Sequence, residues 1–139
     1  MVLRCLPCIV LLLLAIGCDS ERLAVKEAER LEHAQRYVKH RKDLAPELQS
    51  AILKGEVVLG MFPDEARAAG GDAGTAIQRD PRWPASATDE DILEAQRFKP
   101  DSSRIHITFR NRTQFNTSDP VSFKVHFKDG KATRIERIE

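Results

Sequence analysis

The sequence lacks a strong excess of either charge, since 22 lysine and arginine side chains stand against 21 aspartate and glutamate side chains. A formal net charge of +1 excludes the strongly basic composition typical of many nucleic-acid-binding proteins. Aromatic residues are scarce at 6%, and the length of 139 residues is enough for one domain with one small core. Hydrophobic residues still make up 42% of the chain, which excludes wholesale disorder.

Long hydrophobic runs are also lacking, apart from Ile9–Ile16, which follows the single positive charge of Arg4. A membrane-spanning helix needs about 20 apolar residues, so this short run is typical of an export signal. It ends in Ala15-Ile16-Gly17-Cys18, directly before a charged segment. Small residues before a cysteine at this place resemble the lipobox of bacterial lipoproteins, in which the cysteine is acylated and becomes the new N-terminus. The alternative is an uncleaved anchor with an incidental cysteine.

The lipobox resemblance implies a signal peptide over residues 1–17 and lipidation at Cys18. The protein would then lie in the bacterial cell envelope, anchored to a membrane by lipid and facing the periplasm. Cys5 and Cys8 would leave with the signal peptide, so neither a disulfide nor a thiolate metal site remains. Without Arg4 the chain holds as many basic as acidic side chains. Membrane attachment would therefore depend on the lipid, with no polybasic patch to strengthen it.

The first part of the mature chain, residues 18–44, predicts a charged helical spacer. No glycine or proline interrupts the segment from Ser20 to Lys42. Small and apolar residues recur there at helical spacing, so we expect one narrow stripe to dock lightly or not at all. The stripe consists of Ala24, Ala28, Leu31, Ala34 and Val38.

Two short helices follow. Pro46 suits a first helical turn and Gly55 a C-terminal cap, which predicts a helix over Pro46 to Lys54. A second helix is predicted to begin at Pro63 and to end at Gly70-Gly71. The pair has the outline of a helix–turn–helix, but its second helix carries one basic residue, so we expect no nucleic-acid binding.

The segment from Ala51 to Gly71 resembles the opening of the small lipoprotein domain typified by BamE (SmpA/OmlA), a subunit of the outer-membrane β-barrel assembly machinery. The matching residues are Gly55, Val57, Gly60-Met61, Glu65, Arg67 and Gly70. The resemblance implies the fold shared with β-lactamase inhibitory protein, in which two helices pack on a three-stranded antiparallel sheet. It also suggests the outer membrane, whereas Asp19 after the cysteine resembles an inner-membrane retention signal.

The last third of the chain predicts the three strands independently. Apolar residues alternate with polar residues from Ile105 to Arg110 and from Val121 to Phe127. Asp129-Gly130 is a strong hairpin signal before a third strand over Thr133 to Ile138. We therefore expect an α+β domain over 45–139, with two short helices on one sheet face, preceded by the charged N-terminal helix.

Residues 72–103 are too long for an ordinary connection and predict an insertion within this domain. Thr88 is placed to cap a short helix over Asp89 to Gln96. The insertion also holds the only tryptophan, Trp83. This side chain is either an exposed anchor for a partner or a cover for one edge of the core, and the sequence leaves both possibilities open.

The polar side of the predicted sheet is the other candidate partner-binding surface. Its first two strands carry no acidic residue on that side, so an acidic protein patch or, second, anionic headgroups would fit it. Nothing in the sequence predicts a catalytic site, a cofactor, a metal site or a small-molecule substrate, and we expect no enzyme. The candidate residues are Trp83, Arg104, His106, Arg110, Lys124 and His126.

Two function hypotheses follow from the sequence. The first is a lipid-anchored, non-catalytic binding or scaffold module for another envelope protein, acting in outer-membrane assembly or maintenance. The second is an inhibitor or regulator of a secreted enzyme, as the resemblance to the β-lactamase inhibitory protein fold suggests.

Overall fold

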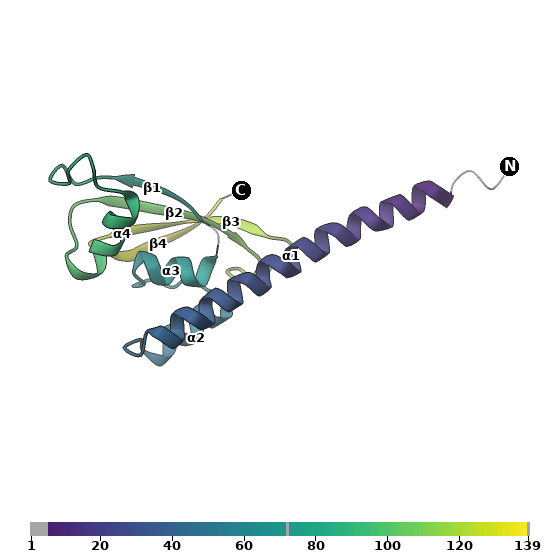
Figure 1. The fold of residues 1–139 in the computed structure, drawn as a ribbon, viewed down its shortest axis with the longest axis horizontal. Coiled ribbons are helices and arrows are strands. Elements are labelled where there is room, and N and C mark those ends of the chain that lie inside the picture. Colours follow the sequence, from purple (N-terminus) through teal and green to yellow (C-terminus); the bar gives the residue numbers. More distant parts are fainter. Residues whose placement is uncertain (1–5, 72, 139) are drawn as a thin grey trace.

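The computed structural model describes residues 6–71 and 73–138, with side chains along the first helix described from Ser20 onward. The predicted leader residues 1–5, with Cys5, and the side chains of Cys8 and Cys18 lie outside the described part. Helices and strands are combined in one α+β fold, which confirms the predicted class (Figure 1). The elements are α1 (Leu6–His40), α2 (Pro46–Lys54), α3 (Pro63–Gly70), β1 (Ala73–Gln78), α4 (Asp89–Phe98), β2 (Arg104–Asn111), β3 (Val121–Lys128) and β4 (Lys131–Ile138).

The sheet is antiparallel in the order β1-β2-β3-β4, so each strand pairs with the next one along the chain. Ile107 pairs with Val125, and Phe109 pairs with Phe123, which places the predicted apolar residues on one face. Asp129 and Gly130 join β3 to β4 with φ angles of 52° and 80°. Positive φ at both positions is typical of the tight hairpin turn that Asp-Gly predicts.

The predicted count of three strands was wrong, because the segment expected to be an insertion supplies a fourth. Strand β1 pairs along its whole length with β2, from Ala73 opposite Phe109 to Gln78 opposite Arg104. Its sequence is rich in alanine and glycine, which are depleted in strands, so local preference gave no signal for it. Pairing with β2 provides the hydrogen bonds that make this segment a strand.

The rest of the former insertion includes the predicted capped helix. Thr88 precedes α4, and its Oγ1 accepts a hydrogen bond of 3.2 Å from the backbone N–H of Asp91. The Asp91 carboxylate accepts the Thr88 N–H at 2.8 Å, which completes a reciprocal cap. These hydrogen bonds confirm the predicted role of Thr88, and α4 joins α2 and α3 as a third short helix of the domain.

The core lies between the apolar sheet face and the short helices. Phe109 and Phe123 are buried with ring centroids 5.4 Å apart, and Phe115 meets Phe123 edge to face. Helix α3 reaches β2 closely at Gly70, where an added Cβ would lie 2.4 Å from the Phe109 ring. Only glycine permits this approach, which explains why the helix ends with this residue against the sheet.

Helix α1 docks on α2 and α3 through only part of the predicted stripe, because Ala34 and Val38 pack against the core while the rest of the stripe does not. Ala24, Ala28 and Leu31 are exposed, whereas Ala34 is buried and Tyr37 is half-buried. One turn before Ala34 the buried residue is Arg30, a charged residue that the apolar pattern could not include. Arg30 donates to the carbonyl oxygens of Ile52 and Leu53 at 3.3 and 3.4 Å, and its partner Glu27 accepts at 2.8 Å.

Arg30 therefore caps the last turn of α2, where carbonyl groups have no partner within the helix. This contact replaces the expected light docking with a specific one, and it determines where α1 crosses the domain. Toward its N-terminus, α1 continues past the domain (Figure 1).

We expect Phe123→Ala to lower the free energy of unfolding by roughly 3–5 kcal/mol, because it removes a fully buried ring from between two others. The neighbouring change Lys124→Ala, on the opposite sheet face, should cost within about 0.5 kcal/mol. Chemical denaturation of both variants measures the difference. Equal losses would mean that the strand faces are assigned the wrong way round.

Candidate functional site

The polar face of the sheet carries five of the six candidate residues that the sequence singled out. Arg104, His106 and Arg110 extend from β2, and Lys124 and His126 extend from β3. His106 lies opposite His126, with ring centroids 6.0 Å apart. The expected grouping of these residues on one face is therefore present, and this face is the side of the sheet opposite the buried core.

Strand β4 brings to this face an acidic residue, which β2 and β3 lack there. Glu136 lies opposite Lys124, and its Oε2 is 3.2 Å from both His126 Nε2 and Arg134 Nη2. The hydrogen bond from His126 and the charge of Arg134 hold the pKa of Glu136 below its ordinary value. One carboxylate thus shares its charge with two neighbours, and the face stays basic through Arg104, Arg110 and Lys124.

Trp83 lies in the loop after β1 and packs, half-buried, against the core. Its indole N–H donates to Asp101 Oδ2, and the other carboxylate oxygen of Asp101 accepts the N–H of Ser103 at 2.8 Å. Although burial raises the pKa of Asp101, hydrogen bonds from Ser103 and Trp83 bring it below its ordinary value. These contacts match the reading of Trp83 as a cover for the core, while its role as a partner anchor stays a prediction.

A buried carboxylate holds the same loop in place. Asp80 is 3% exposed, and its two oxygens accept hydrogen bonds from Arg82 at 2.7 to 3.0 Å. The hydroxyl and the N–H of Ser102 donate to the same carboxylate. The hydrogen bonds from Arg82 and Ser102 hold the pKa of Asp80 far below its ordinary value. The loop is consequently tied to the start of β2 rather than projecting freely.

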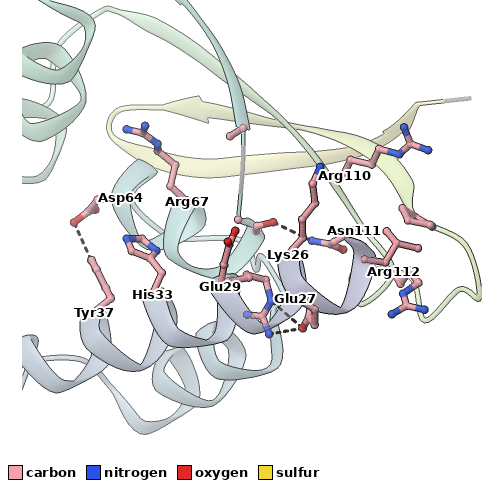
Figure 2. A pocket seen from close by; sticks show the side chains of 16 residues that line it. Lys26, Glu27, Glu29, His33, Tyr37, Asp64, Arg67, Arg110, Asn111 and Arg112 are labelled. Carbon is pink, nitrogen blue, oxygen red and sulfur yellow. Dashed lines mark hydrogen bonds and ion pairs between the residues drawn. The ribbon is translucent and has the colours of Figure 1, made fainter. Parts of the chain in front are cut away.

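A groove of about 900 Å³ runs between α1 and the end of β2. Figure 2 shows Tyr37 and Asp64 toward one end of this groove and Arg110 and Arg112 toward the other. Its titratable lining residues are Lys26, Glu27, Glu29, Arg30, His33, Tyr37, Asp64, Arg67, Arg110 and Arg112. Arg110 belongs to both surfaces, so the groove continues into the basic sheet face.

A cluster of charged side chains holds the helices that form the groove wall. Asp64 of α3 accepts a hydrogen bond of 2.8 Å from Arg97 of α4 and one of 2.8 Å from the hydroxyl of Tyr37 of α1. Arg97 also reaches Glu65 at 3.2 Å and stacks over Phe62 at 4.6 Å from the ring centre. The cluster therefore joins three helices at one point.

Sequence reasoning missed Arg30, Asp64 and Arg97, although all three position the candidate surfaces. Asp64 lies near the start of the predicted second helix, and in the sequence all three look like ordinary solvated charges. The one local signal was Glu27, which is placed three residues before Arg30 on the same helix face. The partners that explain Arg97 are 32 and 33 residues away along the chain, so spacing could not reveal them.

The described residues offer no cluster of three or more histidine, cysteine, aspartate or glutamate side chains for a metal ion. His106 and His126 face each other without such a set. Among the helices in the described part, none has the length and apolar character needed to cross a bilayer.

Comparison with protein-family models, curated proteins and solved structures finds no match to this chain. The resemblance to the BamE-like domain stays a prediction from the motif between Ala51 and Gly71.

Tyr37 is the only tyrosine of the chain, so its ionisation can be followed directly by ultraviolet absorbance. Burial, and then the hydrogen bond to Asp64, raise the pKa of Tyr37 above its ordinary value. The stabilisation by the neutral phenol is complete below pH about 10 and is lost as the pH rises through the folded pKa. We expect the native protein to titrate at higher pH than the denatured chain.

Asp64→Asn is the matched variant, because it removes the negative charge and keeps the side-chain size. It should lower the pKa of Tyr37, because the repulsion by Asp64 is lost while Arg97 and Arg41 still favour the phenolate. Burial, the largest cause of the raised pKa, remains and should keep it above the denatured value. Identical titration curves for native and denatured protein would contradict this placement of Tyr37.

Proposed function

We propose that the chain is a lipid-anchored envelope protein that acts as a non-catalytic binding module for another envelope protein. The observation that carries the proposal is the sheet face opposite the core, where Arg104, Arg110 and Lys124 outnumber Glu136, the one acid that the described strands place there. A face of one predominant charge attracts a partner surface of the other charge and orients it. An acidic patch on a partner protein is the complementary surface.

The geometry of α1 supports anchoring through Cys18. The helix is continuous from Leu6 to His40 and contacts α2 and α3 in its second half. Between Cys18 and the docked Arg30 it rises about 18 Å, at about 1.5 Å per residue. Side chains such as Arg22, Val25 and Lys26 are exposed along this stretch. A lipidated Cys18 would therefore hold the domain at a short, defined distance from the membrane.

The resemblance of residues 51–71 to the BamE-like domain supports a role in outer-membrane assembly or maintenance. The alternative role as an inhibitor of a secreted enzyme requires a segment that enters an enzyme cleft. Residues 73–78 and 89–98 form β1 and α4, and Asp80 ties the loop between them to Ser102. No observation on the described residues favours the inhibitor over the binding module.

Cys18→Ser should release the protein from membranes, because the change removes the sulfur that carries the lipid. The folded domain should stay intact, since the core is formed by residues from Ala34 onward. Membrane fractionation, acyl labelling and circular dichroism together measure both effects. Acyl labelling of the variant equal to that of the wild type would contradict lipidation at Cys18.

The joint change Arg110→Glu and Lys124→Glu should strongly weaken recovery of a cross-linked partner from intact cells. The loss should depend on salt concentration, because screening acts on exposed charges. The matched control is Lys42→Glu with Lys99→Glu, which makes the same charge change at exposed positions outside the sheet. If the sheet variant recovers the partner as well as the control does, the contact surface lies elsewhere and this function loses its support.

A further inference from the structure

The two edge strands of the sheet differ in their charged residues. The outer strand β4 carries the charged residues Lys131, Arg134, Glu136 and Arg137, which discourage pairing with another strand. The other edge, β1, has the sequence Ala-Gly-Thr-Ala-Ile-Gln with no charged residue. Only β2 packs closely along β1, and Gly74, Ala76 and Gln78 are exposed. One edge is thus protected, and the other is open for pairing.

The small residues of β1 leave a path from the basic row of β2 to this open edge. Gly74 lies opposite Thr108 and Ala76 lies opposite His106 on the polar face. Adjacent strands are about 4.8 Å apart, so a strand added beside β1 would lie about 10 Å from β2. Gly74 and Ala76 carry no more than a methyl group, so the polar face is open there between Arg104 and Arg110, which lie at the two ends of the paired stretch.

The cations beside this edge give the added strand its chemistry. Arg104 lies opposite Gln78, the last residue of β1, and Arg110 follows the residue opposite Ala73, the first. Among residues 20–71 and 73–138, the ion pairs include neither Arg104 nor Arg110. Acidic side chains on the outward face of an added strand would meet these two arginines.

The groove beside α1 continues this binding path. Gly71 and Ala73, at the start of β1, line the groove together with Arg67, Arg110 and Arg112. An extended chain that leaves the β1 edge at Ala73 would enter a groove whose end is also basic. Basic side chains therefore flank both the strand edge and the adjoining end of the groove, whereas the acids Glu27, Glu29 and Asp64 line the groove along α1 and α3.

We infer that β1 binds an extended acidic segment of the partner protein as a fifth strand of the sheet. Backbone hydrogen bonds to β1 would provide affinity, and Arg104 and Arg110 would select acidic side chains near the two ends of the bound segment. This inference rests on the proposed function, because it specifies which part of a protein partner is bound and where.

A second copy of the chain fits the same edge less well. Two copies that pair β1 antiparallel in one continuous sheet are related by a two-fold axis perpendicular to the sheet. Their α1 helices would then point in opposite directions within the plane of the sheet. Anchoring through Cys18 requires both helices to reach the same membrane. The uncharged edge therefore suits a partner segment better than a symmetric pair.

The test uses the full chain in a non-ionic detergent and a fluorescent peptide in which glutamate alternates with threonine or valine. We expect saturable binding by anisotropy, weakening with salt, and slower amide hydrogen exchange at residues 73–78. Two control peptides separate the causes: one has lysine in place of glutamate, and one has the glutamates but N-methylated backbone nitrogens. Both should bind at least about tenfold more weakly, because each lacks one of the two interactions.

Gly74 provides a matched pair of variants at the edge itself. No heavy atom lies within 4 Å of the Cβ that a substitution would add there, so larger side chains fit without disturbing the fold. Gly74→Glu should weaken the acidic peptide about tenfold through like-charge repulsion. Gly74→Lys, of similar size, should retain or strengthen binding. Equal losses in both variants would overturn the role assigned to charge.

The remaining outcomes also decide the inference. Equal binding of the N-methylated peptide, or unchanged exchange at residues 73–78, would overturn strand pairing. If sedimentation shows that the chain is dimeric without peptide, and that Gly74→Glu dissociates the dimer, the edge belongs to a second copy. If the peptide does not bind while Arg110→Glu with Lys124→Glu still abolishes partner recovery, the strand site is wrong and the proposed function stands. If that double variant recovers its partner normally, the proposed function fails independently of the peptide result.

Discussion

The ion pair between Arg97 and Asp64 is the contact on which the arrangement of the helices depends. Arg97 is mostly buried, and a buried charge without a partner is strongly destabilising. Asp64 provides that partner from α3, and the Tyr37 hydroxyl of α1 binds the same carboxylate. Since α4, α3 and α1 meet at this one carboxylate, a shift of α4 against α3 would separate the mostly buried Arg97 from Asp64, and a shift of α1 would break the Tyr37 hydrogen bond.

This arrangement separates the two sides of the molecule. The helices cover the apolar face of the sheet, so the opposite face is left to solvent or to a partner, as antiparallel sheets allow. The same cluster keeps α1 beside α3, and the cap that Arg30 makes on α2 adds a second contact. The groove next to α1 and the open sheet face therefore follow from the helix packing (Figures 1 and 2).

The local parts of the fold could be predicted because their causes lie within a few residues. Pro46 and Gly55 bound α2, Thr88 begins α4, and Asp129-Gly130 turns the last hairpin. Alternation also assigned the buried face of β2 and β3 correctly. Each of these features depends on backbone preference or on burial of every second side chain, and both can be read along the chain.

Tertiary contacts decided what the local pattern could not. Strand β1 has weak strand preference and exists through pairing with β2, about thirty residues away. The buried side of α1 includes Arg30 as well as Ala34, because Arg30 donates hydrogen bonds to α2 carbonyls that an apolar pattern cannot reveal. The sequence by itself determined the α+β class and which residues share the polar face. Only the tertiary structure placed the acid Glu136 on that face, tied Trp83 to Asp101 and left β1 as the uncharged edge, because each depends on residues far apart in the chain.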